Sequence, residues 1–499
     1  MVVTAHGLRS GRPHDKISEM VDFQKYTRER RGHWDGLGTR ERPDSSFSSF
    51  YRNGLSSAYS FRIPPGERVL EIGCGCGDLL LALRPGFGVG IDFSEKIIAF
   101  ARDRHGNRPE VSFFCADAHD FVLPGNETFD YIIMSDLIND LWDVQAVFAH
   151  VRRFCHDSSR LLINWYSRLW ELPIKFAQQI GLGNRNLQQN WLTVEDIKHL
   201  FALSGWEFLY RWTEILVPAA MWPIGDFLNR FLARTFPFSE LALCNFVLAR
   251  PEADRVSRSG EFSVSVIVPA RNEAGNIPAI LERVPKMGIC TELVFVEGNS
   301  TDDTRRVFER ELPRFGRLPA SLYFQTGKGK GDAVRLGFSK ARGDILMILD
   351  ADMTVAPEDL PKFHDALVGK KGDFINGVRL VYPLEQESMR FLNLVGNKFF
   401  SLGFSWILGQ SIKDTLCGTK VLWRRDYQKI AANRVYFGDF DPFGDFDLIF
   451  GAAKLNLKIL DLPVRYVGRS YGESNIDRWR HGWLLLQMLI FAARRLKFV

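Results

Sequence analysis

Short apolar runs alternate along the chain with helical segments, and this alternation occurs twice. In the first half, the runs lie at residues 68–72, 87–91, 111–115, 131–134 and 161–165. In the second half, they lie at residues 263–269, 292–297, 321–325, 345–349, 374–378 and 458–462. The pattern predicts two α/β domains with mainly parallel sheets. A further pair of runs, 206–212 and 243–249, predicts a hairpin with a long insertion at the end of the first domain.

A polar, charged stretch, RPEADRVSRSGE, separates the two halves and predicts a linker. On each side of it the alternation of strand, turn and helix restarts. The ligands of such domains bind beyond the carboxyl ends of the strands. We therefore divide the chain into four segments: an N-terminal helical lid at 1–60, a first domain at 61–250, a linker at 251–262, and a second domain at 263–499 that ends in an apolar and basic helix.

Composition narrows the class of protein only modestly. Of the 499 residues, 46% are hydrophobic and 25% are charged, and the net charge of +5 does not require a nucleic-acid partner. The 40 phenylalanines suit large cores or a surface that meets lipid. Seven cysteines without a CxxC pair argue against a disulfide framework or a zinc site. With no signal-peptide pattern and no run of about 18 apolar residues, these features favour a cytoplasmic protein.

The first chemical signature is VLEIGCGCGD, in which an apolar strand runs into Gly73, Gly75 and Gly77. Glycines let the backbone turn tightly and approach a ligand closely. The spacing GxGxG differs from the GxGxxG of dinucleotide-binding turns, and Glu71 precedes it. A carboxylate would repel a pyrophosphate but attract the cationic methionine end of S-adenosylmethionine.

Further acids follow the next strands in order: Asp92, Asp117 and Asp136. A carboxylate after the second strand can accept bonds from ribose hydroxyls, and one after the third can meet an adenine amino group. Taken singly, any one of these acids is better explained as a helix cap or turn former. Four acids in register with four successive strands favour a ligand site.

Residues from about Val69 to Arg250 resemble a class I S-adenosylmethionine-dependent methyltransferase, which implies a Rossmann-like fold. In the lid segment, Tyr26, Arg30 and Tyr51 are candidate contacts of the methyl acceptor. By motif, the resemblance assigns the cofactor to Glu71, Gly73, Gly75, Gly77, Asp92, Asp117 and Ala118.

The acceptor side is less defined. The segment DLINDLWD follows the fourth strand and faces the expected methyl-transfer site. Asp136 is the candidate catalytic base, and Asn139 and His119 are further candidates for positioning an acceptor hydroxyl. The alternative is that transfer needs little beyond positioning, with His119 in a turn and with Asp140 and Asp143 on a solvated helix face.

The second signature is ILDADM, an apolar strand that ends in Asp350 and Asp352. Alternation along an extended segment would send both carboxylates to one side. Such a pair suits Mg²⁺ or Mn²⁺, which would bridge a diphosphate and neutralise the leaving group. In GKGKGD, Lys328 and Lys330 lie just before a helix, where basic side chains and free amides attract phosphate. The alternative for this segment is a flexible charged loop.

Together with SVIVPARNEAGNI and VEGNSTDDT, these motifs resemble a family 2 glycosyltransferase of the GT-A fold, with the motif order of dolichyl-phosphate mannose synthases. The resemblance covers about Ser263 to Val499. It implies a nucleotide-sugar donor held by Pro269, Arg271, Glu273, Glu297, Lys330 and Asp350, and a metal held by Asp350 and Asp352. Where the family often has a second acid, this chain has Gly298, so UDP and GDP both remain open.

The same resemblance implies roles for later residues. Asp445 is the preferred base that deprotonates the acceptor, and Asp447 is the second candidate. A lipid-phosphate acceptor is already anionic and needs no base. Arg469 and Ser474 match a segment that closes over the diphosphate.

Two apolar segments, HGWLLLQMLIFAARRLKFV and FLNLVGNKFFSLGFSWILGQ, have the composition of helices that lie in a membrane interface. The alternatives are core-packing helices or a dimer interface, and we favour peripheral association with the cytoplasmic membrane face. A polyprenyl phosphate or a small molecule is then the expected acceptor. The sequence therefore predicts a fusion of two transferases. The rivals are a glycosyltransferase with a silent S-adenosylmethionine-binding regulatory domain, and a membrane-surface scaffold.

Overall fold

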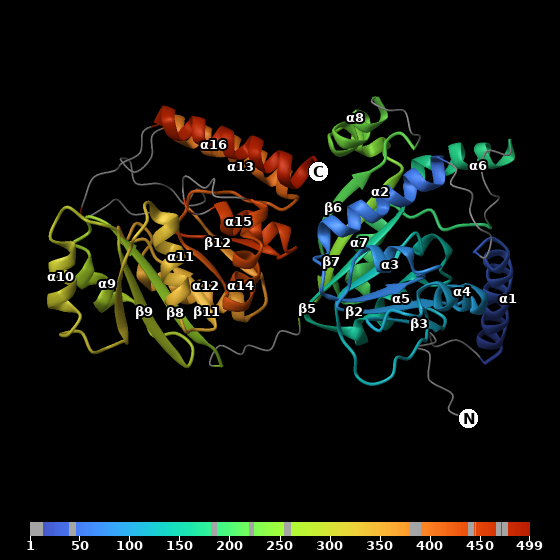
Figure 1. Cartoon of the computed structure of the whole chain (residues 1–499), viewed down its shortest axis with the longest axis horizontal. Coiled ribbons are helices and arrows are strands. Elements are labelled where there is room, and N and C mark those ends of the chain that lie inside the picture. The colour runs from blue at the N-terminus through green and yellow to red at the C-terminus, as the bar shows by residue number, and fades with distance from the viewer. Residues whose placement is uncertain are drawn as a thin grey trace. The chain divides into compact units, whose positions relative to one another are not determined.

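The computed structural model describes residues 13–38, 46–180, 187–218, 224–253, 261–379, 391–437, 444, 446–465, 471 and 478–499. The chain folds as two compact units, Met1–Glu252 and Ala253–Val499, which we call the N-terminal and C-terminal units. Each unit contains one seven-stranded sheet with helices packed on its faces (Figure 1).

The sheet of the N-terminal unit has the order β3-β2-β1-β4-β5-β7-β6. Neighbours from β3 to β5 are parallel, and β7 is antiparallel to both β5 and β6, which confirms the predicted terminal hairpin. The strands are β1 (Arg68–Ile72), β2 (Phe87–Asp92), β3 (Val111–Cys115), β4 (Phe129–Ser135), β5 (Cys155–Tyr166), β6 (Trp206–Glu214) and β7 (Cys244–Pro251).

Helices cover both faces of this sheet because alternate strand residues point to opposite sides. Val69 belongs to a core with residues of α2, α3 and α4, and the adjacent Leu70 belongs to a core with residues of α5 and α7. The helices are α1 (Pro13–Gly38), α2 (Ser46–Arg62), α3 (Asp78–Ala82), α4 (Glu95–His105), α5 (Val144–Val151), α6 (Glu171–Gln179), α7 (Val194–Leu203) and α8 (Ile224–Arg230). Short 3₁₀ turns are η1 (Ile138–Asp140), η2 (Arg152–Phe154), η3 (Arg168–Trp170), η4 (Leu232–Arg234) and η5 (Phe238–Leu241).

The sheet of the C-terminal unit has the order β10-β9-β8-β11-β13-β12-β14. The strands are β8 (Ser263–Ala270), β9 (Cys290–Glu297), β10 (Ala320–Phe324), β11 (Ile345–Ile348), β12 (Phe374–Val378), β13 (Lys420–Trp423) and β14 (Ile459–Pro463). The sequence pattern missed β13, which is antiparallel to both β11 and β12. Its four residues, KVLW, begin with a buried lysine and are too short to form a recognisable apolar run.

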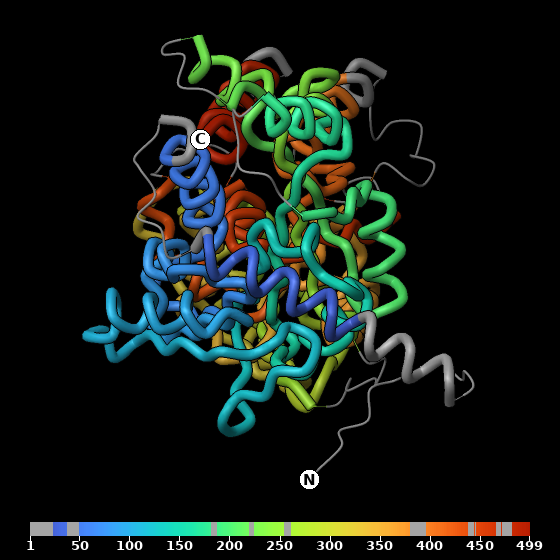
Figure 2. The backbone as a smooth tube through the Cα atoms, turned by 90° about the vertical axis from the view of Figure 1, so that its right-hand side faces the viewer, coloured from blue at the N-terminus to red at the C-terminus, as the bar shows by residue number. Residues whose placement is uncertain are grey.

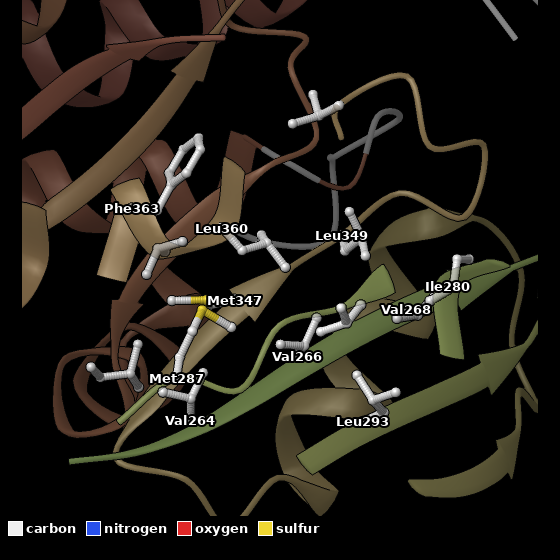
Figure 3. Close-up of a cluster of buried hydrophobic side chains, with 14 of the residues drawn as sticks. Val264, Val266, Val268, Ile280, Met287, Leu293, Met347, Leu349, Leu360 and Phe363 are labelled. Atoms are coloured by element: carbon white, nitrogen blue, oxygen red, sulfur yellow. The ribbon is translucent and has the colours of Figure 1, made fainter. Parts of the chain in front are cut away.

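The helices of this unit are α9 (Ile277–Arg283), α10 (Thr304–Glu311), α11 (Lys330–Lys340), α12 (Leu360–Val368), α13 (Phe391–Leu408), α14 (Arg424–Ala432), α15 (Phe446–Lys454) and α16 (Arg478–Ala492). Shorter turns are η6 (Pro357–Asp359), η7 (Arg434–Tyr436) and the π-helical η8 (Ala493–Lys497). Side chains of β8, β11 and α12 meet in one core, where Val266 lies with Met347 and Leu360 (Figure 3). This core fixes the strand ends that carry the candidate donor site.

Helices α13 and α16 lie side by side (Figure 1). A Cβ on Gly403 would lie 2.8 Å from Leu489, and the rings of Trp406 and Phe498 are 5.7 Å apart. The pair leaves large apolar side chains exposed, namely Phe399, Leu402, Trp406, Trp483 and Ile490. Among the helices in the described part of the chain, none has the length and apolarity needed to cross a bilayer.

Candidate functional sites

The turn after β1 is built by three glycines in left-handed backbone conformations, with φ of +74° at Gly73, +52° at Gly75 and +79° at Gly77. A Cβ on Gly73 would lie 2.9 Å from Leu137, and one on Gly77 would lie 2.6 Å from Phe113. A Cβ on Gly75 would meet no described atom within 4 Å. Packing therefore requires the outer two glycines, whereas Gly75 faces open space where a ligand can approach the backbone.

Glu71 lies directly before this turn, near the carboxyl end of β1, and is only 2% exposed. Its Oε2 atom has no hydrogen-bond partner among the described residues. Burial raises the pKa of Glu71 well above its usual value; the backbone N–H of Leu80 opposes the rise, and the charge of Asp92 adds to it. A buried carboxylate oxygen without a partner is unfavourable. The site therefore fits a ligand that brings a cation, as the ammonium group of S-adenosylmethionine does.

Asp92 ends β2 and bridges the glycine turn to the start of α4. Its carboxylate accepts hydrogen bonds from the backbone N–H groups of Gly75, at 3.1 Å, and Ser94, at 3.0 Å. The Ser94 hydroxyl caps α4 and also bonds to Asp35 of α1. Asp92 thus fixes the turn, and burial raises the pKa of its carboxyl group.

Asp117 follows β3 and is held by His119. The ring Nδ1 of His119 lies 2.6 Å from Asp117 Oδ1, while its Nε2 accepts the backbone N–H of Asp143 at 3.2 Å. Because Nε2 accepts, the Nδ1 atom carries the proton that is donated to Asp117. Burial by itself would raise the pKa of Asp117, but these hydrogen bonds with His119 hold it below its usual value. Between the two residues, Ala118 packs against the core under α5 and α7.

Asp136 follows β4 and is the centre of a polar network. Its backbone has φ of +53°, which is rare for a residue other than glycine and is often found at functional sites. The Tyr51 hydroxyl of α2 lies 2.9 Å from the carboxylate, and Asn164 Nδ2 of β5 lies 2.6 Å from Oδ1. Burial raises the pKa of Asp136 to about 6, although both of these hydrogen bonds oppose the rise.

The same network reaches Glu71 and β7. Tyr59 donates to Asn164 Oδ1 at 2.7 Å, and the charges of both Asp136 and Glu71 contribute to its raised pKa, which burial dominates. Tyr51 also lies 3.3 Å from the sulfur of Cys244. The network therefore adjoins the site proposed for the methionine end of the cofactor. Tyr59, Asn164 and Cys244 were not found from the sequence, because nothing in the local pattern shows that β5 and β7 approach α2.

Asp140 is not on a solvated helix face, which corrects the expectation from the sequence. Its carboxylate lies 3.8 Å from Arg30 Nε and accepts Trp34 Nε1–H at 3.2 Å, so it anchors α1. Asp143 does lie at an exposed position, where it caps α5. The Tyr26 hydroxyl of α1 lies 3.4 Å from the carbonyl oxygens of Asp140 and Leu141. Helix α1 crosses the face of the N-terminal unit that is turned toward the viewer in Figure 2. Arg30 and Tyr26 therefore hold the lid, while Tyr51 alone of the three predicted contacts joins Asp136.

Asn139 is buried and binds the segment before α7: its Nδ2 donates to the carbonyl of Asn190 at 2.7 Å. Its Oδ1 atom has no hydrogen-bond partner among the described residues, and its predicted role as an acceptor contact stays a prediction. The bond instead fixes the segment that leads into α7.

A set of exposed apolar side chains lies on the segments that follow the carboxyl ends of β5 and β6 in the N-terminal unit. The sequence pattern did not predict this set. Segments η3–α6 and α8–η5 follow the carboxyl ends of β5 and β6, and Trp170 Nε1 donates to the Leu241 carbonyl at 2.9 Å. Trp170 packs in the same core as Tyr51. The only signal in the sequence was the density of phenylalanine and leucine within the insertion. We call this set the apolar rim: Leu169, Leu172, Phe176, Ile180, Ile224, Phe227, Phe231, Phe236, Phe238 and Leu241.

In the C-terminal unit, Asp350 follows β11 and forms an ion pair with Lys330 at the start of α11, with Nζ 2.7 Å from Oδ1. Burial alone would raise the pKa of Asp350, but the charges of Lys330, Lys420 and Arg379 lower it below its usual value. Lys420 in β13 is fully buried, and Arg379 follows β12. Neither cation was identified from the sequence, since both depend on the placement of β13 between β11 and β12.

Asp352 binds a different partner. Strand β11 ends at Ile348, and the chain then turns, with the backbone N–H of Met353 bonded to the Asp350 carbonyl at 3.1 Å. The alternation of an extended segment therefore does not apply to these acids, which corrects that part of the sequence argument. The Oδ1 atom of Asp352 accepts from the N–H and the hydroxyl of Thr354, at 3.1 and 2.9 Å.

The acids Asp350 and Asp352 still fit a divalent cation in charge and donor type. Asp350 is held ionised, and carboxylate oxygens are preferred by Mg²⁺ and Mn²⁺. Within the described residues, no three His, Cys, Asp or Glu side chains are grouped as metal ligands.

The predicted donor residues gather at the ends of two neighbouring strands. Pro269 lies in β8 with Arg271 directly after it, and Glu297 ends β9 and is 5% exposed. Glu297 Oε1 accepts the backbone N–H of Ser300 at 2.5 Å. Glu273 lies in the turn before α9, where its Oε2 accepts Asn276 Nδ2 at 2.7 Å.

Gly298 stands where the resemblance leads one to expect a second acid, and the structure gives a reason. A Cβ there would lie 3.2 Å from the Cβ of Arg271 and 3.3 Å from Gln325 Oε1. The position is therefore tightly packed, and a side chain would require its neighbours to move.

The predicted acceptor base and closing loop are described only in part. Asp447 lies in the first turn of α15, with Oδ2 3.3 Å from Arg434 Nη2, so the structure uses it in an ion pair. Asp445, Arg469 and Ser474 lie outside the described residues. Tyr471, two residues after Arg469 in the sequence, lies against the turn after β8, since a Cβ on Gly275 would be 2.6 Å from its ring.

Comparisons with known proteins agree with this division of the chain. Residues 265–433 match the family described as "Glycosyl transferase family 2", and residues 69–158 match the family described as "Methyltransferase domain". A dolichol-phosphate mannosyltransferase from Pyrococcus furiosus is 28% identical over 219 residues, which are 43% of this chain and 59% of that protein. The glycosyltransferase AglJ of Haloferax volcanii is 28% identical over 235 residues, 46% of this chain and 72% of that protein.

An undecaprenyl-phosphate 4-deoxy-4-formamido-L-arabinose transferase from Klebsiella pneumoniae is 24% identical over 221 residues, which are 44% of this chain and 63% of that protein. The chain thus spans less than two thirds of several of the relatives it matches. Among solved structures, magnesium protoporphyrin IX methyltransferase from Synechocystis, with S-adenosylhomocysteine bound, has 14% identity and a TM-score of 0.33. That similarity covers 46% of this chain and 100% of that one.

Proposed function

We propose that this chain, which joins a methyltransferase domain to a family 2 glycosyltransferase domain, is a bifunctional transferase. The N-terminal unit transfers a methyl group from S-adenosylmethionine. The C-terminal unit transfers a sugar from a UDP- or GDP-sugar, with inversion and with Mg²⁺ or Mn²⁺. The observation that carries the proposal is that each sheet presents its own carboxylate at its carboxyl edge: Glu71, beside an open glycine turn, and Asp350, held ionised.

In the methyltransferase half, the cofactor supplies an electrophilic methyl group when it is bound. Glu71 would hold its ammonium group, Gly75 would allow its close approach, and Asp92 and Asp117 would hold its ribose and adenine. Asp136 accepts the proton of the methyl acceptor, because a carboxyl group with a pKa of about 6 is ionised at neutral pH and remains basic enough to act. Tyr51 holds that carboxylate in place.

In the glycosyltransferase half, Asp350 and Asp352 would hold the metal ion, which neutralises charge on the departing nucleotide diphosphate. Pro269, Arg271 and Glu297 bind the nucleoside at the ends of β8 and β9. Asp445 remains the preferred base for a hydroxyl acceptor. Asp447 is the weaker candidate because of its ion pair with Arg434.

A lipid-linked acceptor is supported by apolar surfaces in both units. The printed names of two relatives specify dolichol phosphate and undecaprenyl phosphate as the carriers that those proteins modify. In this chain, α13 and α16 expose large apolar side chains, and η8 beside them carries Arg494, Arg495 and Lys497. Such a surface suits peripheral binding to an anionic membrane face. The apolar rim supports the same type of acceptor for the methyltransferase half.

The simplest use of the fusion is one pathway, in which both units act on the same lipid-linked product. Tethering raises the concentration of one product near the other site. If the two units were found to modify unrelated compounds, this part of the proposal would fail.

Calorimetry on the full chain with Mn²⁺ tests the function directly. We expect wild type to bind S-adenosylmethionine and either UDP- or GDP-sugars. Gly75→Arg should abolish only cofactor binding, since its side chain would fill the open space beside the turn. The double variant Asp350→Ala/Asp352→Ala should abolish only sugar-donor binding. Failure of wild type to bind any nucleotide sugar would reject the transferase assignment of the C-terminal unit and favour a scaffold.

A further inference from the structure

The backbone beside the ion pair of Lys330 and Asp350 in the C-terminal unit leaves space for both charged groups. Besides the 2.7 Å contact between the charged atoms, the loop before β13 is shaped to accommodate the pair. A Cβ on Gly418 would collide with both the Asp350 carboxylate and the Lys330 ammonium group. Close packing of this kind around both charged groups distinguishes the pair from the mobile ion pairs of a protein surface.

Lys330 and a divalent metal ion require the same carboxylate. The ammonium group already neutralises Asp350, so an ion that approaches the site alone meets a like charge and a carboxylate in use. The Asp350 and Lys330 side chains are 29% and 28% exposed, so a ligand from solvent can reach the pair.

A nucleotide diphosphate provides Lys330 with another partner. Lys330 is the first residue of α11 and follows Gly329, whose φ of +85° turns the chain into the helix. The first amides of the helix have no partner within it, and together with the lysine charge they favour a phosphate group. Movement of Lys330 from Asp350 to phosphate would leave the carboxylate available to a metal ion.

We propose that Lys330 is an exchangeable counterion that makes metal binding depend on the donor. Without donor it neutralises Asp350, and with donor it pairs with the diphosphate while the metal takes the carboxylate. This inference rests on the proposed donor site and adds an order of events to it. Since the coupling is reciprocal, metal and nucleotide each raise the affinity for the other.

The test uses the full chain as wild type, Lys330→Met and Lys340→Met. Lys340 is an exposed lysine at the opposite end of the same helix, α11, and serves as the matched control. Binding of Mn²⁺ is measured from the electron paramagnetic resonance signal of the free ion, with and without UDP or GDP. Binding of UDP and GDP without metal is measured by calorimetry in EDTA, and thermal unfolding checks that each variant folds.

We expect Lys330→Met to bind Mn²⁺ alone about two- to fivefold more tightly than wild type, because a partly exposed ion pair competes with the metal by about this factor. The same variant should bind the nucleotide without metal more weakly. Lys340→Met should change neither affinity. Opposite changes in the two affinities are the specific signature, since a merely structural lysine would weaken both.

Unchanged or weaker Mn²⁺ binding by Lys330→Met, with nucleotide binding by wild type intact, would overturn the counterion role alone. Absence of Mn²⁺-dependent nucleotide binding in wild type would overturn both this role and the proposed donor site. The two failures are therefore distinguishable.

Discussion

Glu71 and Asp350 lie at the carboxyl edges of two similar sheets, yet their surroundings shift their pKa values in opposite directions. Glu71 is buried, its Oε2 atom has no hydrogen-bond partner among the described residues, and burial raises its pKa well above the usual value. Asp350 has Lys330, Lys420 and Arg379 nearby, and their charges lower its pKa despite burial. The neighbouring side chains, not the type of fold, therefore decide whether such an acid is neutral or ionised before a ligand arrives.

The difference predicts two modes of binding. A cationic ligand beside Glu71 lowers its raised pKa, so binding to the N-terminal unit should release a proton at any pH where the free carboxyl group is protonated. A cationic ligand of Asp350 must displace a lysine, so binding to the C-terminal unit should exchange one cation for another. Three substitutions would break or sharpen this contrast.

Gly418→Ala should have the largest effect, because the new methyl group would collide with both members of the Asp350–Lys330 pair. We expect the C-terminal unit to lose about 1–3 kcal/mol of unfolding free energy, as for other overpacked positions. Nucleotide-dependent Mn²⁺ binding should be lost. Chemical unfolding, monitored through hydrogen exchange of the backbone amides in β11 and β13, measures the loss of unfolding free energy. Calorimetry measures the loss of nucleotide-dependent Mn²⁺ binding.

Gly316→Ala is the control for this change, since a Cβ at Gly316 would meet no described atom within 4 Å. S-adenosylmethionine binding should survive in both variants, which shows that the N-terminal unit stays folded. If Gly418→Ala binds metal and nucleotide as tightly as wild type does, the loop before β13 adapts to the methyl group. The ion pair then does not depend on the shape of this loop.

Glu71→Gln should weaken S-adenosylmethionine binding about ten- to a hundredfold, the range for loss of a hydrogen bond to a charged group. In wild type, Glu71 is protonated below its raised pKa and ionised in the complex. Binding should therefore release protons, and affinity should rise with pH until the pKa of free Glu71 is passed. Calorimetry in buffers of different ionisation enthalpy counts the protons released, and the variant should release none.

Glu95→Gln changes an exposed acid of the same unit and should leave both the affinity and the proton release as in wild type. Proton uptake, or an affinity independent of pH in wild type, would contradict the assignment of Glu71 to the cofactor ammonium group.

Asp136→Asn should have the smallest effect on stability, and the effect should depend on pH. The carboxyl group has a pKa of about 6 in the folded protein, against about 3.9 in an unfolded chain. The folded state therefore binds the proton more tightly. The stabilisation that comes from protonating Asp136 is complete below about pH 4 and is lost as pH rises through about 6.

The variant lacks this titration, so its stability relative to wild type should improve by about 2 kcal/mol between pH 4 and pH 7. Urea unfolding of both proteins across this range measures the difference. A constant difference at all pH values would show that Asp136 does not titrate as proposed.

The strand pattern could be predicted from the sequence because buried strands leave a local apolar signal. The predicted first strand at 68–72 matches β1, and the predicted hairpin pairs as β6 and β7. Strand β13 was missed because four residues that begin with Lys420 do not form such a signal. The burial of this lysine depends on β11 and β12, which lie far from it in sequence.

The candidate sites divide in the same way. The glycine turn and the acids at the strand ends are local features, and the structure places them at the predicted edges. The partners of these acids are not local: Tyr51 reaches Asp136 from α2, and Arg30 reaches Asp140 from α1. For this reason the sequence wrongly placed Asp140 on a solvated face.

The sequence by itself determined two α/β units, their chain order, and the identity of the acids at each carboxyl edge. These follow from strand periodicity and from residue types at fixed positions, which are properties of short segments. Only the tertiary structure decided the state of each acid. Charge and burial depend on side chains that the fold brings from distant segments. Within the part of the chain that the structure describes, those side chains leave Glu71 Oε2 without a hydrogen-bond partner and pair Lys330 with Asp350.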